Sequence, residues 1–547
     1  MVTETSFEDL THGFIADYLE FYPTLGTSLG LHLYDGRTGD YSQVAIDTWL
    51  RTLSVWERRL AGFDVRPLTP QETLDRALIQ QTVAGERFRW EALREHERNP
   101  ISGSWPLDVT AYIKRNYAPL EERVRAMASH LEDVPLFLEV ARGHLREPLP
   151  LPMVETAKDI FSGYVSFYAT DLPREVSRVA DTALRERCTA AAGAAADAVK
   201  EYLAFLDDAR TRATAEFAIG EANFVEMLRT GEMVDIPLDR LLALGEAELA
   251  RLTEDVRATA ARIDRSADPR AVMARLGRNH PTAEALIPET RAMLEGLRQF
   301  LIDHEIVTVP PDVRPLVEET PPFARWAFAM MDTAGAFEQV ANESYYYVTP
   351  PEADWPPELK DEWLTKFDYA TLKDVSIHEA YPGHFVHFMH VRRAPSMPAK
   401  VLTSYSFVEG WAHYSEEMML EAGVDPDPGF RLAYLGEALV RQVRYLAAIR
   451  MHARGLSLDA AAKMFEQQAY MEPLTARKEA VRGTFDPGYL NYTLGKFLVR
   501  RLRDDYRAER GAAFSLREFH DRLIGLGAPP VPLARRALLK RYSGIIL

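Results

Sequence analysis

The chain has 547 residues, of which 47% are hydrophobic and 27% charged, the balance of a globular protein rather than a disordered one. Its formal net charge of −17 argues against nucleic acid as a partner and against an anionic membrane surface, because both bind through clustered lysine and arginine. Cys188 is the single cysteine, which excludes an intrachain disulfide and a metal cluster built on cysteines.

The first nine residues bear on where the protein works. They are acidic and lack both the basic start and the apolar run of a signal peptide. The sequence also has no stretch of roughly 18 apolar residues, so it predicts no membrane span. We therefore expect a cytoplasmic protein without a membrane partner, and the oligomeric state stays open.

Residues 1–300 are predicted to form an N-terminal helical region that covers a cleft. Apolar residues between Leu238 and Val256 recur at three-, four- and seven-residue spacing, which predicts an amphipathic helix entered through Pro237. The alanine-rich segment 189–200 is typical of a further helix.

Residues 301–358 differ from the segments on either side. The runs 306–310 and 344–349 are rich in β-branched and aromatic residues and are bounded by proline or polar residues, which predicts strands of a small sheet. Residues 359–547 return to helical patterns and form the helical region that carries the candidate chemistry. The predicted fold class is mainly α, with helices around one small β-sheet, and the three regions are expected to form one intertwined unit.

The segment 374–393 holds four histidines, and Glu379 directly follows the first of them, His378. Zinc peptidases use two histidines one helical turn apart, with a glutamate after the first, as two metal ligands and a general base. Here the next histidine, His384, comes six positions later, which on a regular helix places the two side chains roughly 120° apart. The intervening segment 381–383, Tyr-Pro-Gly, favours a kink or bulge, and a two-residue bulge would return both histidines to one face.

A third protein ligand is needed if the metal is to keep one position open for water. Residues 403–417 predict a second helix, on which Glu409, His413 and Glu416 share one face at four- and seven-residue spacing. Glu409 suits a ligand, and Glu416 or His413 would support a ligand through a hydrogen bond.

Two other interpretations of these histidines stay open. His384, His387 and His390 follow one another at three-residue spacing, so they form a rival ligand set on one helix. Histidines and glutamates on helices are also commonly solvated or hydrogen-bonded groups that bind no metal. Two histidines around a glutamate, a Pro-Gly break and an acidic helix downstream together favour a metal site.

Two motifs resemble those of a known family. His378-Glu-Ala-Tyr-Pro-Gly-His384 and Glu409-Gly-Trp-Ala-His-Tyr-Ser-Glu416 resemble the hallmark segments of the bacterial family catalogued as domain of unknown function 885. The resemblance covers nearly the whole chain. That family looks like a distant relative of helical zinc peptidases such as thimet oligopeptidase, carboxypeptidase Taq and angiotensin-converting enzyme.

The resemblance implies a large multi-helix peptidase-like fold whose small sheet lies beside the metal site, a Zn²⁺ cofactor and hydrolysis of peptide bonds. It also favours Glu409 as the third ligand, because thimet oligopeptidase carries its glutamate ligand in a Val-Glu pair similar to Val408-Glu409. This chain departs from the family pattern at His413, where an aliphatic residue is usual, and in the residues before His452.

The resemblance further implies groups that assist the reaction. His452, Arg482 and Tyr492 match a histidine, an arginine and a tyrosine that family members tend to carry. Tyr492 or His452 would donate a hydrogen bond to the developing oxyanion, and Arg482 would pair with a substrate carboxylate or equally form a structural salt bridge. Tyr347 and Tyr489 could contact substrate, Tyr347 from an edge strand, although such tyrosines more often pack in a core.

The predicted function is therefore a zinc-dependent peptidase, in which His378, His384 and Glu409 hold Zn²⁺ and Glu379 acts as the general base. One alternative is a metallohydrolase that acts on a non-peptide amide or ester. Another is a non-catalytic helical protein that binds a ligand in a cavity. The sequence does not indicate the length of the peptide substrate or whether cleavage is terminal or internal.

Overall fold

The computed structural model describes residues 6–66, 68–311, 313–321, 325, 328–541, 544 and 546–547. Residues 1–5, part of the N-terminal segment from which location was predicted, lie outside the described residues. Contacts between Cα atoms divide the chain into two compact units. Unit 1 comprises residues 1–219, 334–342 and 396–401, and unit 2 comprises residues 220–333, 343–395 and 402–547.

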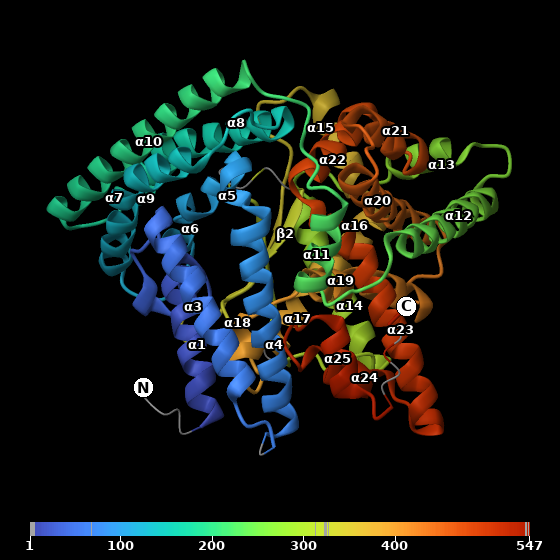
Figure 1. The fold of residues 1–547 in the computed structure, drawn as a ribbon. Helices are drawn as coiled ribbons and strands as arrows, with labels where there is room; N and C mark the ends of the chain where they lie inside the picture. The colour runs from blue at the N-terminus through green and yellow to red at the C-terminus, as the bar shows by residue number, and fades with distance from the viewer. Residues whose placement is uncertain are drawn as a thin grey trace. The chain divides into compact units, whose positions relative to one another are not determined.

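The protein is mainly helical, with one three-stranded β-sheet, as the sequence predicts (Figure 1). None of the helices in the described part of the chain is long and apolar enough to cross a membrane. The expected amphipathic helix is present as α12 (Leu238–Ile263), with Pro237 as its N-cap, and the alanine-rich segment lies within α10 (Thr182–Arg210).

Unit 1 is built from helices alone among its described residues. Its three long neighbours α7, α8 and α10 pack side by side, and the short helix α18 returns to pack against α1 and α4 (Figure 1). The elements are α1 (Phe7–Phe21), α2 (Pro23–Ser28), η1 (His32–Tyr34), α3 (Gln43–Gly62), α4 (Pro70–Arg87), η2 (Phe88–Leu93), α5 (Glu95–Arg98), η3 (Pro100–Leu107), α6 (Thr110–Lys114), α7 (Leu120–His144), α8 (Leu151–Ser166), η4 (Phe167–Asp171), α9 (Leu172–Val176), α10 and α18 (Met397–Val401).

Unit 2 contains the sheet and the helices that carry the candidate site. This unit also includes the helices that follow residue 219, since α12 packs along α20. Its helices are α11 (Glu221–Gly231), α12, α13 (Pro269–Leu276), α14 (Leu286–Asp303), α15 (Pro357–Leu364), η6 (Thr365–Phe367), α16 (Tyr369–Glu379), α17 (His384–Val391), α19 (Tyr405–Glu421), α20 (Pro428–Ala453), α21 (Leu458–Gln468), α22 (Pro473–Phe485), η7 (Pro487–Leu490), α23 (Asn491–Arg510), η8 (Gly511–Ala513), α24 (Leu516–Ile524) and α25 (Val531–Leu538).

The sheet has the strand order β1 (Leu316–Glu319), β3 (Tyr345–Val348), β2 (Ala329–Asp332). β3 pairs parallel with β1 and antiparallel with β2, so it is the central strand and not the edge strand that the sequence suggested for Tyr347. The strand predicted over 344–349 is confirmed, whereas β1 and β2 were not foreseen. β2 packs against α16, and the Tyr346 hydroxyl lies 3.3 Å from Ser376 Oγ on that helix.

The strand predicted over 306–310 is wrong, and side chains explain why. The backbone N–H of Thr308 donates to Asp521 Oδ1 over 2.7 Å, so it is not available to a neighbouring strand. The carbonyl oxygens of Ile306 and Thr308 lie 2.7 and 2.9 Å from ring nitrogens of His520 and His390. Side chains therefore occupy the backbone groups that a strand partner would use.

The crossing of α19 and α23 brings two backbones unusually close. A Cβ on Gly410 would lie 2.4 Å from the Cα of Gly495, and a Cβ on Gly495 would lie 1.9 Å from the carbonyl oxygen of Ser406. Ser404 caps α19 by accepting a hydrogen bond from the N–H of Phe407, which fixes where the helix starts. The two helices consequently meet in one register.

We expect Gly410→Ala to destabilise unit 2, because the added methyl group would meet backbone atoms that have no rotamer by which to move away. The expected loss is about 2 kcal/mol or more of unfolding free energy, toward the upper range for overpacking. Chemical denaturation measures it. Gly296→Ala on α14 is the matched control: nothing lies within 4 Å of its added Cβ, and it should stabilise the helix by roughly 0.5–1 kcal/mol. Equal losses in both variants would contradict the close crossing.

Candidate metal centre

The chain breaks between the two histidines of the first motif. α16 ends at Glu379 and α17 begins at His384, so the expected bulge within one helix is instead a turn between two helices. A Cβ at Gly383 would lie 1.7 Å from the carbonyl oxygen of His378, so only glycine fits this turn. The N–H of Gly383 donates to the carbonyl of Ile377 over 2.9 Å, which closes the turn against the end of α16.

The turn is also held from α19. Trp411 is fully buried, and its Nε1 donates a hydrogen bond of 3.0 Å to the carbonyl oxygen of Pro382. The imidazole rings of His378 and His384 consequently meet edge-to-face, with centroids 4.9 Å apart and planes at 90°. Two rings that a straight helix would separate therefore lie beside each other.

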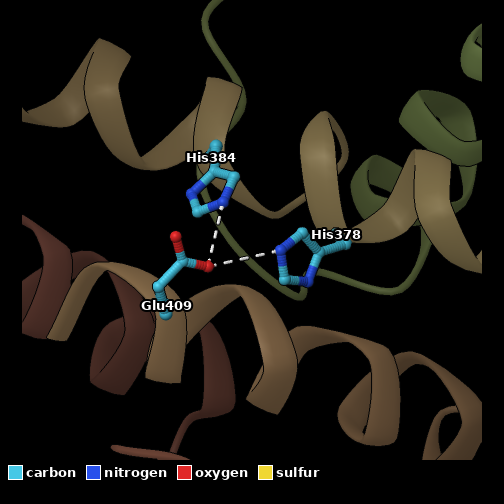
Figure 2. Close-up of side chains that lie close together, drawn as sticks. All are labelled: His378, His384 and Glu409. Atoms are coloured by element: carbon cyan, nitrogen blue, oxygen red, sulfur yellow. Dashed lines mark ion pairs between the residues drawn. The ribbon is translucent and has the colours of Figure 1, made fainter. Parts of the chain in front are cut away.

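The carboxylate of Glu409 on α19 completes the cluster. Its Oε2 lies 3.5 Å from Nε2 of His378 and 3.5 Å from Nε2 of His384 (Figure 2). Among the described residues, these three are the group whose possible ligand atoms all lie within 4.8 Å of one another. The arrangement brings together the three residues that the sequence and the resemblance proposed as ligands.

The geometry fits a small tetrahedral cation. Ligand atoms about 2.0–2.1 Å from a tetrahedral zinc lie roughly 3.3–3.4 Å from each other, close to the 3.5 Å separations around Glu409. Glu409 Oε2 is buried and accepts no hydrogen bond from any described residue. A buried carboxylate oxygen is costly without a partner, and a cation between it and the two imidazoles would supply one.

The ionisation of the cluster reflects strong coupling between its members. Burial alone would lower the pKa of His378, but the carboxylates of Glu409 and Glu416 raise it to about 10. Burial alone would raise the pKa of Glu409, but the imidazoles of His384 and His378 lower it instead. Two carboxylates around His378 thus favour a positive charge at this position.

Glu416 orients His378 from behind. Its side chain is fully buried, and its Oε1 lies 2.6 Å from Nδ1 of His378, which leaves Nε2 of that ring turned toward Glu409. The other oxygen, Oε2, lies 2.9 Å from Nδ1 of His413. The prediction that Glu416 and His413 support the ligands thus has a geometric basis, since the carboxylate fixes the ring and its tautomer.

Arg441 on α20 and Asp374 on α16 are members of this network that the sequence did not reveal. Arg441 Nη2 lies 3.2 Å from Glu416 Oε1, and its Nη1 lies 2.8 Å from Glu437. Burial, and next Glu416, raise the pKa of Asp374 well above its usual value. Burial, followed by the charge of Lys496, lowers the pKa of His413 to about 3, so its imidazole is neutral. Only the i, i+4 spacing of Glu437 and Arg441 is visible in the sequence, and it does not point to the site.

The rival histidine set does not converge. His387 Nε2 lies 3.0 Å from the carbonyl oxygen of Gly527, and burial lowers the pKa of this histidine to about 3. His390 Nε2 lies 2.9 Å from the carbonyl oxygen of Thr308. Both rings are turned to backbone groups elsewhere in unit 2, so neither shares a ligand position with His384.

Glu379, the proposed base, is next to the ligand candidate His378 in the chain. It is the last residue of α16 and directly follows His378, at the start of the turn. Its side chain is half-buried, and no described residue forms a hydrogen bond or ion pair with its carboxylate. A reactive carboxylate must keep an oxygen available, and Glu379 does so while the nearby acids Glu409 and Glu416 are engaged.

Tyr492 lies beside the cluster, in contact with His378. Its ring stacks on that of His378 with centroids 6.3 Å apart, and burial and then Glu409 raise its pKa, which keeps the phenol protonated. The guanidinium groups of Arg444 and Arg482 lie over this ring, 5.2 and 5.7 Å from its centroid. Arg482 also donates to the Tyr492 hydroxyl over 3.4 Å.

Arg482 is held by partners of its own. It donates to Asp486 over 3.1 Å and to the Tyr405 hydroxyl over 3.1 Å, so it forms the structural salt bridge that the sequence left as an equal alternative. These contacts use its Nε and Nη2 groups and position Tyr492 and Tyr405, while no described residue forms a hydrogen bond with its Nη1.

Three other residues singled out from the sequence lie in the protein interior. His452 is 1% exposed, and its Nε2 lies 2.7 Å from the carbonyl oxygen of Gly483, so a role as oxyanion donor finds no support. Tyr489 is fully buried, and its hydroxyl packs against Gly483. Tyr347 is 5% exposed and stacks on Tyr345, which is the core packing that the sequence had favoured over substrate contact.

We expect Glu416→Gln to weaken binding of a divalent metal by roughly 10- to 100-fold, because the amide is a weaker partner for His378 Nδ1 than the carboxylate. Competition with a chromophoric chelator measures the zinc affinity, and circular dichroism checks that the fold is intact. Glu421→Gln on the same helix is the matched control, since that side chain pairs with Arg503 away from the cluster. Unchanged affinity in the folded Glu416→Gln variant would remove its assigned role.

A solved structure of a candidate lipoprotein of unknown function from Shewanella oneidensis matches with a TM-score of 0.82 at 23% identity, over 98% of this chain and 100% of that one. A solved candidate lipoprotein from Colwellia psychrerythraea matches with a TM-score of 0.84 at 15% identity, over 97% and 98% of the two chains. These likenesses show a shared fold, and the expected cytoplasmic location of this chain stays a prediction. No curated protein matches the sequence. The model of a bacterial protein family of unknown function, DUF885, matches residues 23–538, and the chain therefore belongs to that family.

Proposed function

We propose that this protein is a zinc-dependent peptidase. The observation that carries the proposal is the convergence of two histidine Nε2 atoms on one oxygen of Glu409, with the unengaged Glu379 next to His378 in the chain. Three protein ligands leave a fourth tetrahedral position for water or substrate, which is typical of catalytic rather than structural zinc sites. A binding protein with a structural metal would need neither the open position nor the adjacent base.

Zinc bound by His378, His384 and Glu409 would supply a Lewis acid that acidifies water and polarises a scissile carbonyl group. Glu379 takes the proton from the attacking water and delivers it to the leaving amine, as a general base and then a general acid. Glu416 keeps the His378 ring in the orientation that presents Nε2 to the centre. Glu409, Glu379 and Glu416 thus act as ligand, base and orienting group, respectively.

Tyr492 supplies a hydrogen-bond donor for the oxyanion that develops during attack. Its hydroxyl remains protonated, and its ring stacks on His378 and carries the guanidinium groups of Arg444 and Arg482 over it. Two positive charges beside a phenol strengthen it as a donor to a developing negative charge. Arg444 is itself held by Glu479 through hydrogen bonds of 2.7 and 2.8 Å, so the arrangement is set before substrate binds.

We expect purified protein to contain about one zinc per chain by inductively coupled plasma mass spectrometry, and to cleave members of a peptide panel. Glu379→Gln should keep the zinc and lose about 10²- to 10⁴-fold in kcat, the range for removal of a general base. Glu358→Gln, an exposed glutamate on α15, should retain both metal and activity.

Each outcome of that experiment separates one alternative from the proposal. Turnover of amides or esters without turnover of peptides would replace peptidase with a metallohydrolase of another substrate class. Protein that holds no zinc and takes up none when it is added would contradict the metal centre and favour a ligand-binding role. Full activity in Glu379→Gln would remove this residue as the base.

We further expect Tyr492→Phe to lower kcat by roughly 10²- to 10³-fold with a much smaller change in KM, because the hydroxyl acts on charge that develops only in the transition state. Tyr489→Phe is the control from the adjoining turn, since its buried hydroxyl bonds to no described residue. Steady-state kinetics on the best peptide of the panel measures both variants, and a Tyr492→Phe enzyme with an unchanged kcat would contradict the role.

A further inference from the structure

Unit 1 encloses a cavity of about 440 Å³ that has no part in the candidate metal centre. This volume lies within the range of small-molecule sites, which are mostly apolar and carry a few converging polar groups. All of the residues that line it belong to unit 1, and those that bear on a ligand include Tyr18, Tyr41, Arg89, Trp90 and Phe137.

Aromatic rings form much of the wall. Tyr41 stacks on Trp90 with ring centroids 6.2 Å apart, and Tyr18 meets Tyr22 edge-to-face at 5.1 Å. Trp105 is 78% exposed although it lines the cavity, so one side of the wall reaches solvent. Rings held in this way present flat apolar surface at little cost in side-chain entropy.

Three side chains of this wall carry hydrogen-bond donors that are not engaged. Arg89 donates from Nε to Glu95 over 3.1 Å, while its two Nη groups bond to no described residue. The hydroxyls of Tyr18 and Tyr41 likewise have no hydrogen-bond partner among the described residues, and neither oxygen is sealed from water. Because these side chains line the cavity, their donors are available to a molecule inside it.

Each charged group around the cavity already has a partner within the protein. Arg89 is paired with Glu95, and the carboxylate of Glu86, behind the wall, already accepts from Tyr22 over 2.6 Å and from Trp49 over 3.1 Å. Burial and next His144 lower the pKa of His96 to about 4, so that histidine adds no charge. Burial raises the pKa of both Tyr18 and Tyr41, which keeps them as donors. The charged groups of the wall are already paired and need no counter-ion, whereas the unengaged donors lack a hydrogen-bond acceptor.

We propose that this cavity binds an uncharged aromatic molecule that carries a carbonyl oxygen, such as an aromatic amide. The ring of the ligand packs among Tyr41, Trp90 and Phe137. Its carbonyl oxygen accepts hydrogen bonds from the hydroxyls of Tyr18 or Tyr41, or from the Nη groups of Arg89. An anion would add to the charges of Glu86 and Glu95, and a cation would face the guanidinium of Arg89.

Isothermal titration calorimetry with three ligands of matched shape tests this chemistry. The expected result is that 3-phenylpropanamide binds with one site per chain and at least about tenfold more tightly than 3-phenylpropanoate or 2-phenylethylammonium. Tyr18→Phe and Tyr41→Phe should each weaken the amide about 2- to 10-fold, the value of one neutral hydrogen bond. Tyr164→Phe, a half-buried tyrosine of unit 1 outside the cavity, should leave the affinity unchanged.

A cavity-filling variant provides an independent arm. Ala141 on α7 lines the cavity, and Ala141→Trp should abolish binding of the amide. Equal or tighter binding of either ion would overturn the ligand class. Absence of amide binding, or binding that survives both Ala141→Trp and the two tyrosine variants, would overturn the site. If Ala141→Trp does not fold, the tyrosine variants decide alone. Because these residues all lie in unit 1, failure here is separate from failure of the zinc site.

Discussion

The candidate metal centre depends on the contact between the backbone of Gly383 and the carbonyl oxygen of His378. No side chain fits at that point, since a Cβ would approach the oxygen to 1.7 Å. The chain can therefore turn sharply in the four residues between the end of α16 and the start of α17, and His384 then faces α19. Glu409 then lies 3.5 Å from both imidazoles. The roles proposed for Glu379 and Tyr492 depend on this cluster.

Behind the ligands, unit 2 buries several polar groups in contact with one another. A buried charge is tolerated only when it is paired and hydrogen-bonded, and Glu416 meets that condition through His378, His413 and Arg441. Removing one partner would leave the others uncompensated. The orientation of the His378 ring therefore depends on the whole buried network.

The sequence predicted most of what local pattern controls. The mainly helical fold, the helix at Leu238 and the strand at 344–349 follow from periodicity and composition. The sequence did not predict contacts between residues far apart in the chain. Asp521 and two histidines replace a strand partner at 306–310, and the carbonyl oxygen of Gly483 lies within hydrogen-bond distance of His452. The three proposed ligands do lie together, but the turn between them, rather than a bulge, could not be read from spacing.

The glycine crossing of α19 and α23 has a consequence for the rigidity of the candidate metal centre. α19 carries Glu409 next to Gly410, and α23 carries Tyr492 one turn before Gly495, so both groups are attached to a single rigid body. Thermal motion that displaces one helix must carry the other with it. In the proposed reaction, the separation between the carboxylate and the phenol would therefore change little as charge develops, and the reorganisation energy of this part of the centre would be small.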